Sequence, residues 1–377
     1  MILPINSQNK TENKIYDINV PDVIERVRTH DFNPLNEDNS MTLDRSLNVA
    51  GIADLNNNDW QVRLLAVRDL VRVGDNNVKE VIAGLTDKSA HVRQVCAMAL
   101  GILRSKDAIS SLEQLVRQDE NTMVRSQAVI ALGQIEAGSS LALLHETLKT
   151  DPSRDVQHQC DLAIYQIEKQ LGTTDKQLSA FLALDESTFN SVYSGSLAPE
   201  FRLDDTDGNE WKLSQFRNEK WVVLIWVFAD WCPVCHGEFQ DLMEMQDEFD
   251  NAGVQVFTLE MHDRYQGRVM VGKELDPSYW FSKKSFHEAY TERIWWPHLL
   301  DRAGAIGAMY GADPLAFAVH AEYINRPTTV IIDKEGIVRL NYQGTFWGDR
   351  PTIEQTLKMI ETGDFSFEHP QRLSVNN

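Results

Sequence analysis

The sequence predicts a multidomain protein in which an all-α solenoid precedes an α/β domain. Two observations lead to this prediction. A helical pattern recurs in the first half of the chain with a period of about 31 residues. In the second half, the apolar run Trp221–Phe228 is typical of a buried strand, and a turn with two cysteines and a helical pattern follow it. At 377 residues the chain is long enough for two separate cores.

The chain begins with a polar stretch, residues 1–40, which we expect to form an arm or cap because it has no sustained period. Residues 41–171 contain the repeat. A valine marks each unit, a small residue stands four positions after it, and a helix-capping residue stands three positions before it. The valines are Val62, Val92, Val124 and Val156, the small residues are Ala66, Cys96, Ala128 and Cys160, and the capping residues are Asp59, Ser89, Asn121 and Ser153.

An earlier apolar helix is expected in each unit, over Val78–Leu85, Ile109–Val116 and Leu141–Leu148. Such two-helix units bury their apolar faces only by stacking on one another, so the repeat predicts a solenoid. The pattern resembles HEAT repeats of the short, PBS-lyase-like kind. Because repeat surfaces suit protein binding, we expect this part of the chain to bind a protein client or redox partner.

Cys96 and Cys160 have a structural explanation within the repeat. Both occupy the small buried position that alanine takes in the sister units. A free cysteine packs like a small hydrophobic residue. We therefore expect two inert thiols, and no disulfide between them, since a bridge would have to skip a repeat.

The α/β domain is expected over residues 196–377, after a junction at 172–195 that contains a capping helix, Lys176–Leu184. Its last helix is predicted at Thr352–Glu361, with Pro351 at the start. A long insert occupies about residues 262–325. The predicted strands are Glu210–Leu213, Trp221–Phe228, Val254–Glu260, Thr328–Asp333 and Val338–Gln343.

The insert is rich in aromatic residues and histidines. These aromatic residues form either a wall over the cysteines or the core of an extra subdomain. Glu260, His262 and Asp263 at the end of a strand are an alternative metal site. The aromatic and histidine residues are Tyr279, Trp280, Phe281, Trp295, Trp296, His262, His287, His298 and His320.

Composition and charge exclude several functions. The net charge of −20 disfavours binding to nucleic acid or to an anionic membrane. No apolar run is long enough for a membrane span, and the N-terminus has no signal-peptide pattern, so we expect a cytoplasmic protein. In that compartment a CxxC pair is typically catalytic or metal-binding.

Four motifs follow one another in the second half of the chain. They are Ala198–Leu203 with Asp207-Gly208, then Trp231–Cys235, Arg326–Asp333 and Lys334–Gly336. Together they resemble the redoxin (AhpC/TSA-type) and TlpA-like branches of the thioredoxin superfamily. The resemblance covers about residues 196–365 and implies a thioredoxin-like fold. It also implies that Pro327 is a cis proline facing the cysteines.

The residues around the cysteines predict dithiol chemistry. Cys232 lies at or near a helix N-terminus, which favours a thiolate, and Cys235 is within reach for a disulfide. Pro233 suits the first helical turn. The resemblance implies that Glu238, three residues after the second cysteine, is an acid/base. The alternative is an ordinary exposed glutamate.

The resemblance also places substrate contacts at Trp231, Pro233, Arg326 and Pro327. A charge at Arg326 would lower the pKa of Cys232 or hold an anionic substrate. The alternative is a solvated arginine that takes no part.

We therefore predict a thiol–disulfide oxidoreductase that needs no cofactor. Cys232 attacks a disulfide and Cys235 resolves the mixed disulfide. One alternative is a peroxide- or small-molecule-reducing redoxin, of peroxiredoxin or deiodinase type, although Ala229 and Ile225 replace the threonine and proline of the peroxiredoxin pattern. Another is a binding scaffold with an inactive redoxin domain. Haem attachment at CxxCH and a structural zinc site are disfavoured, since the motif follows a strand and no second ligand pair accompanies it.

Overall fold

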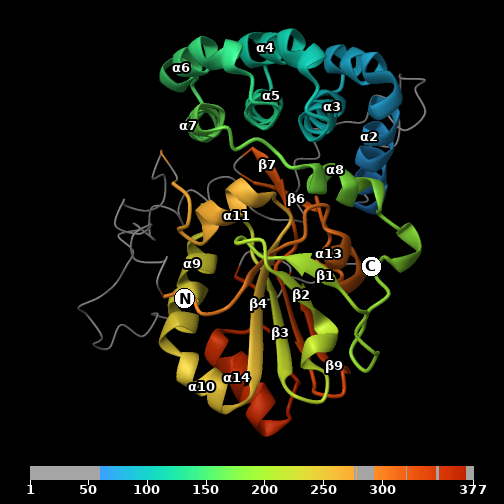
Figure 1. Ribbon diagram of the computed structural model, residues 1–377, viewed down its shortest axis with the longest axis vertical. Coiled ribbons are helices and arrows are strands. Elements are labelled where there is room, and N and C mark those ends of the chain that lie inside the picture. The colour runs from blue at the N-terminus through green and yellow to red at the C-terminus, as the bar shows by residue number, and fades with distance from the viewer. Residues whose placement is uncertain (1–59, 276, 278–292, 320, 345–347, 371–377) are drawn as a thin grey trace.

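The computed structural model describes residues 60–275, 277, 293–319, 321–344 and 348–370 (Figure 1). The predicted arm at residues 1–40 lies outside this range. So do the aromatic residues Tyr279–Phe281, as well as His287 and His320.

The first half of the described chain is a stack of helices, as the repeat predicts. Helices α3, α5 and α7 lie side by side in one layer, and α4 and α6 form the second layer (Figure 1). The capping residues Ser89, Asn121 and Ser153 immediately precede α3, α5 and α7. The helices are α2 (Trp60–Ala83), α3 (Ala90–Ile102), α4 (Ile109–Gln118), α5 (Thr122–Ile135), α6 (Leu141–Thr150) and α7 (Arg154–Lys169).

The first unit departs from the prediction, because the expected helix at Val78–Leu85 is the second part of one continuous helix, α2. Gly74 lies within it. A Cβ at this position would be 2.2 Å from Leu103 Cδ1, so the glycine allows close packing against the next unit. Gly74 therefore allows α2 to approach the next unit closely, and it does not mark a loop.

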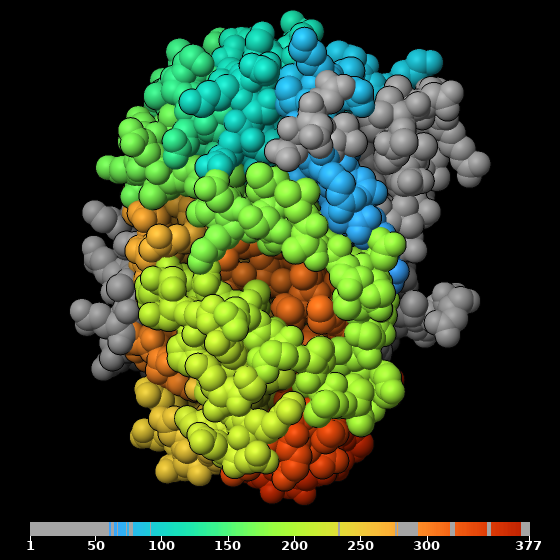
Figure 2. Space-filling view, turned by 45° about the vertical axis from the view of Figure 1, so that its right-hand side comes forward, coloured from blue at the N-terminus to red at the C-terminus, as the bar shows by residue number. Residues whose placement is uncertain are grey.

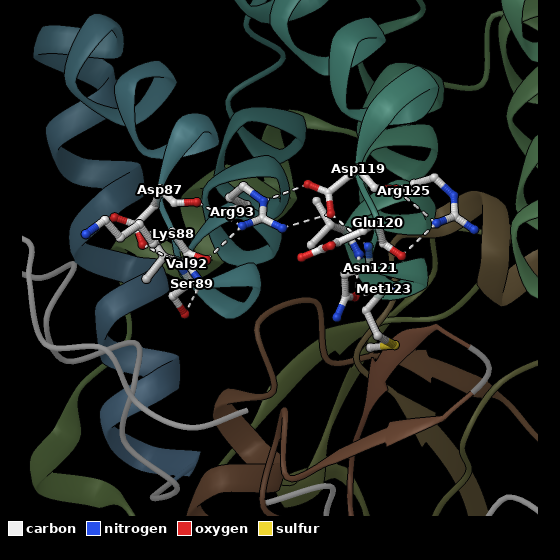
Figure 3. A network of polar contacts seen from close by, with 11 residues as sticks. Asp87, Lys88, Ser89, Val92, Arg93, Asp119, Glu120, Asn121, Met123 and Arg125 are labelled. Carbon is white, nitrogen blue, oxygen red and sulfur yellow. Dashed lines mark hydrogen bonds and ion pairs between the residues drawn. The ribbon is translucent and has the colours of Figure 1, made fainter. Parts of the chain in front are cut away.

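Arginines join successive units of the solenoid (Figure 3). The guanidinium of Arg93 donates to the carboxylate of Asp119 at 2.6 and 2.8 Å and to carbonyls of the preceding loop. Arg125 repeats this arrangement with Asp151, at 2.8 and 3.0 Å. The arginine that follows the repeated valine therefore links the loops on either side of it.

Both solenoid cysteines are free, fully buried thiols, as predicted. Burial raises the pKa of Cys96 to about 12, and it also raises the pKa of Cys160. Neither thiol ionises appreciably near neutral pH.

The second half contains a mixed five-stranded sheet in the order β5-β4-β3-β8-β9, which agrees with the predicted α/β class. Strands β3, β4 and β5 are parallel, whereas β8 and β9 are antiparallel to their neighbours. The strands are β1 (Arg202–Asp204), β2 (Glu210–Lys212), β3 (Trp221–Trp226), β4 (Val254–Glu260), β5 (His298–Leu300), β6 (Phe317–Val319), β7 (Glu322–Ile324), β8 (Thr328–Ile332) and β9 (Val338–Gln343).

Helices cover both faces of this sheet. Val223 and Ile225 of β3 point into the apolar cluster that contains residues of α9 and α14, whereas Val222 and Leu224 point into the cluster with α13. The central strand is therefore buried on both sides. The helices after the solenoid are α8 (Asp175–Leu182), α9 (Pro233–Glu244), α10 (Gln246–Asn251), α11 (Arg264–Met270), α13 (Ala305–Tyr310) and α14 (Ile353–Thr362).

The described part of residues 262–325 belongs to the main fold. It supplies the edge strand β5, helix α13 and the hairpin β6–β7. The indole of Trp295 donates to the Leu242 carbonyl of α9 at 2.7 Å, and that of Trp296 donates to Thr258 of β4 at 3.0 Å. Trp296 belongs to the buried apolar cluster that also contains Cys232 and Cys235, and Trp295 packs against this cluster, so the two tryptophans are part of the α/β core and not of an extra subdomain.

The solenoid packs directly against the α/β domain (Figure 2). Tyr165 of α7 stacks on Tyr265 of α11 with ring centroids 6.0 Å apart, and its hydroxyl donates to Glu274 at 2.8 Å. Asp263 accepts from the backbone N–H of Thr174 at 2.5 Å. Strand β7 contacts α5. The inner helices therefore face the α/β domain. Among the described residues, no helix combines the length and the apolar character that a membrane crossing requires.

Candidate active site

The two cysteines lie where β3 leads into α9. Cys232 is the N-cap of α9, and its Sγ accepts a hydrogen bond from the backbone N–H of Cys235 at 3.3 Å. Pro233 is the first residue of the helix. Cys232 and Cys235 form a disulfide with their Cα atoms 5.4 Å apart. The helix-end N–H groups and dipole would stabilise a Cys232 thiolate after reduction.

The disulfide is closed off from solvent. Cys232 is 1% exposed and Cys235 is fully buried. The residues before Cys232 are engaged by other parts of the chain. The indole of Trp231 donates to Glu322 of β7, and His158 of α7 lies 3.7 Å from the Asp230 carboxylate. The hairpin and the solenoid thus both reach the active-site loop.

Glu238 is a buried acid on α9, only 8% exposed, and not an ordinary surface glutamate. Burial raises its pKa to about 7; Arg350 opposes this rise and Asp241 adds to it. The carboxyl group can therefore hold or release a proton near neutral pH.

Arg350 is a site residue that the sequence analysis missed. Its side chain is 2% exposed and makes an ion pair with Glu238, with 2.9 Å between Nε and Oε1. Its Nη2 lies 3.4 Å from Cys235 Sγ, and its Nη1 donates to the Trp226 carbonyl at 3.0 Å. Pro351 predicted a helix start here, but no sequence pattern indicates that the preceding arginine points inward.

Arg326 is bound by two groups that lie near it in the fold. Its Nε makes a 2.6 Å ion pair with Asp313, and its Nη1 donates to the Gly344 carbonyl at 3.0 Å. Its charge is therefore compensated locally. The guanidinium in contact with the cysteine pair is that of Arg350.

The expectation of a cis proline was wrong. No cis peptide bond occurs in the described parts of the chain, so the bond between Arg326 and Pro327 is trans. The trans form is the lower-energy state of such a bond. With this bond in the trans form, the backbone N–H of Arg326 donates to the Ala312 carbonyl at 2.5 Å.

A second group of buried charges follows β4. His262 lies 3.5 Å from Glu260 and 3.7 Å from Glu322. Burial disfavours the charge of His262, but these carboxylates and Asp230 outweigh it and raise its pKa to about 9. Burial similarly opposes ionisation of Glu260, yet His298 and His262 lower its pKa to about 2.

The three residues considered as a metal site do not converge. Glu260 pairs with His262 and His298. Asp263 instead makes an ion pair with Arg302 at 2.6 Å and accepts a hydrogen bond from the backbone N–H of Thr174 in the junction. These contacts describe an ion-pair cluster.

Comparison with known proteins supports the fold assignment for both halves. Residues 194–341 match the AhpC/TSA family, and residues 51–132 match HEAT repeats. The thiol-disulfide oxidoreductase ResA of Geobacillus thermodenitrificans is 28% identical over 173 residues, which cover 45% of this chain and 80% of that protein.

One further relative is named as a thiol:disulfide interchange protein and another as a peroxiredoxin. The thiol:disulfide interchange protein DsbE of Vibrio cholerae is 27% identical over 42% of this chain and 70% of its own length. The chloroplastic peroxiredoxin Q of Gentiana triflora is 28% identical over 47% of this chain and 70% of its own length. The chain therefore joins a segment that matches HEAT repeats to a segment that matches the AhpC/TSA family.

Proposed function

We propose that this protein is a thiol–disulfide oxidoreductase that uses Cys232 and Cys235 as its dithiol. The observation that supports this most is the pairing of the two sulfurs at the N-terminus of α9, with Glu238 and Arg350 buried beside Cys235. In the reductive direction, the Cys232 thiolate attacks a client disulfide and one client sulfur leaves. Cys235 then attacks Cys232 Sγ and releases the second client sulfur.

Glu238 is the proposed acid/base, because thiolate attack and departure both require proton transfer. Trp231, Pro233, Arg326 and Pro327 remain proposed substrate contacts, reached when the covering segments move. The solenoid is proposed to select a protein client or redox partner, since α7 reaches Asp230 beside the cysteine motif. We also propose a cytoplasmic location, where a CxxC pair is typically catalytic rather than structural.

Peroxide reduction is the second candidate, because a peroxiredoxin Q is among the relatives. In that reaction peroxide oxidises the Cys232 thiolate to a sulfenic acid, and Cys235 condenses with it to a disulfide and water. Ala229 occupies the threonine position of the peroxiredoxin pattern, so the hydroxyl that assists peroxide is missing.

Turnover of the full-length protein separates these candidates. We expect reduction of a protein disulfide, such as insulin, with dithiothreitol as the reductant, and slow consumption of hydrogen peroxide. Cys232→Ser should abolish disulfide reduction, whereas Cys96→Ala should leave it unchanged. Peroxide turnover that is much faster than disulfide reduction would favour the second candidate. Absence of both activities would favour a binding scaffold.

A further inference from the structure

One guanidinium lies between two groups that can each carry a negative charge. Arg350 contacts Glu238 Oε1 at 2.9 Å and Cys235 Sγ at 3.4 Å. The carbonyl of Trp226, at the end of β3, accepts a third contact at 3.0 Å. All three partners are buried and so are shielded from bulk water. The position of the guanidinium is therefore set by the site itself.

The charge balance changes when the disulfide is reduced. In the disulfide state, Cys235 is neutral and Arg350 neutralises the Glu238 carboxylate. Reduction creates a second potential anion, the Cys235 thiolate, next to the same cation. One cation cannot neutralise two buried anions, and an uncompensated buried charge is costly. The reduced site therefore keeps one proton, which Glu238 and Cys235 compete for.

We propose that Arg350 is a catalytic residue that stabilises the Cys235 thiolate, while Glu238 holds the proton displaced from that sulfur. This assignment rests on the proposed dithiol function. It makes Cys235 nucleophilic at the resolving step without exposing it to solvent.

The resolving step is balanced in atoms and charge. Before it, Cys232 is bonded to the client sulfur, Cys235 is a thiolate and Glu238 is protonated. Cys235 Sγ attacks Cys232 Sγ, the Cys232–client bond breaks, and its electron pair leaves on the client sulfur. The proton from Glu238 ends on that client thiolate. Arg350 then neutralises the Glu238 carboxylate again, as in the disulfide state.

Other charges face this group from the packed helices. Asp241, also on α9, disfavours the Glu238 carboxylate, and Asp241 in turn interacts with Glu244 and with Glu354 of α14. These are acidic groups, so Arg350 is the cation that acts on Glu238 among the described residues.

The thiolate of Cys235 can be titrated directly in full-length Cys232→Ser protein, by its ultraviolet absorbance. Added to this background, Arg350→Met should raise the titration midpoint of Cys235 by about one to two pH units, a ten- to hundredfold loss of thiolate. Arg350→Lys should give an intermediate shift, because it keeps the charge but loses the planar fork. Glu238→Gln should shift the midpoint downward, since the competing anion is removed.

The titration midpoint of Cys235 is expected to rise in the Arg350 variants and to fall in Glu238→Gln. These opposite shifts distinguish the proposal from a merely structural role of Arg350. Arg339→Met is the matched control, because Arg339 is ion-paired with Asp333 on the same sheet. If Arg350→Met does not fold, the Arg350→Lys and Glu238→Gln titrations decide. An unchanged midpoint in the arginine variants, or an upward shift in Glu238→Gln, would overturn the proposal. The titration needs no client, so it stands apart from the turnover test of the dithiol function.

Discussion

At the residue scale, the site depends on how burial alters acid strength. Glu238 is almost completely buried, and burial raises its pKa from 4.5 to about 7 although Arg350 opposes the rise. The same cause acts on Asp301, whose pKa is raised to about 6. For both acids the folded state binds a proton more tightly than the unfolded chain does.

The stability of the disulfide form should therefore depend on Glu238 between pH 4.5 and 7. Because the folded pKa lies above the unfolded one, this residue's contribution is complete below pH 4.5 and is lost as the pH rises to about 7. The expected loss is on the order of 2 to 3 kcal/mol. Urea unfolding of wild type and Glu238→Gln across this range measures it.

The comparison cancels the other titrating groups, since Asp301 is present in both proteins. Glu238→Gln should lose less stability than wild type as the pH rises. Parallel pH profiles for the two proteins would show that the Glu238 carboxyl is not perturbed in the folded state.

At the element scale, a two-residue pattern accounts for the solenoid. Val92, Val124 and Val156 are buried in the stack, and the arginines after the first two of them link neighbouring loops. The ion pair between Arg125 and Asp151 has side-chain exposures of 11% and 5%. A pair buried to this degree leaves a costly unpaired charge when one partner is removed.

Arg125→Ala should therefore lower the free energy of unfolding by about 3 kcal/mol. Arg117→Ala is the matched control, because its pair with Glu113 on α4 is half exposed. It should cost less than about 1 kcal/mol. Chemical unfolding followed by circular dichroism measures both. Equal losses in the two variants would mean that the inter-repeat contacts of Arg125 contribute nothing specific.

Local patterns in the sequence predicted the elements but not how distant elements meet. The period of the valines and the capping residues located α3, α5 and α7, and the apolar run located β3. Strands β5, β6 and β7 were missed, because each is a three-residue strand inside the segment that was interpreted as an insert. Arg350 was missed because its partners lie more than 100 positions away. No local sequence pattern indicates that the solenoid lies close to the cysteines either.

At the scale of the whole molecule, the solenoid contacts the segments that surround the redox site. Its inner helices contact the hairpin β6–β7, and the hairpin holds Trp231 through Glu322. Tyr165 and Thr174 add contacts at α11 and Asp263. We therefore expect a client disulfide to reach Cys232 when these contacts open.

Weakening this interface should therefore increase access to Cys232. Tyr165→Ala removes a ring stack and a hydrogen bond, together about 1 to 2 kcal/mol. Alkylation of Cys232 in the reduced protein should become several-fold faster. Glu146→Ala, on the exposed side of α6, is the control and should change nothing.

Mass spectrometry of the alkylated protein identifies the labelled cysteine. Cys96 and Cys160 should stay unlabelled, which excludes general unfolding as the cause. Alkylation of Cys232 at the same rate in wild type and Tyr165→Ala would contradict a closing role for the solenoid.

Trapping of the mixed disulfide tests the proposed roles of the two cysteines most directly. In Cys235→Ser the attack by Cys232 is intact but resolution is blocked, so covalent adducts should accumulate and disappear on reduction. In Cys232→Ser no adduct should form, since Cys235 lies behind the N-cap position, within the first turn of α9. Non-reducing electrophoresis of the full-length variants after incubation with a disulfide client separates these results. Adducts that form abundantly with Cys232→Ser, and not with Cys235→Ser, would contradict the assignment of Cys232 as the attacking thiol.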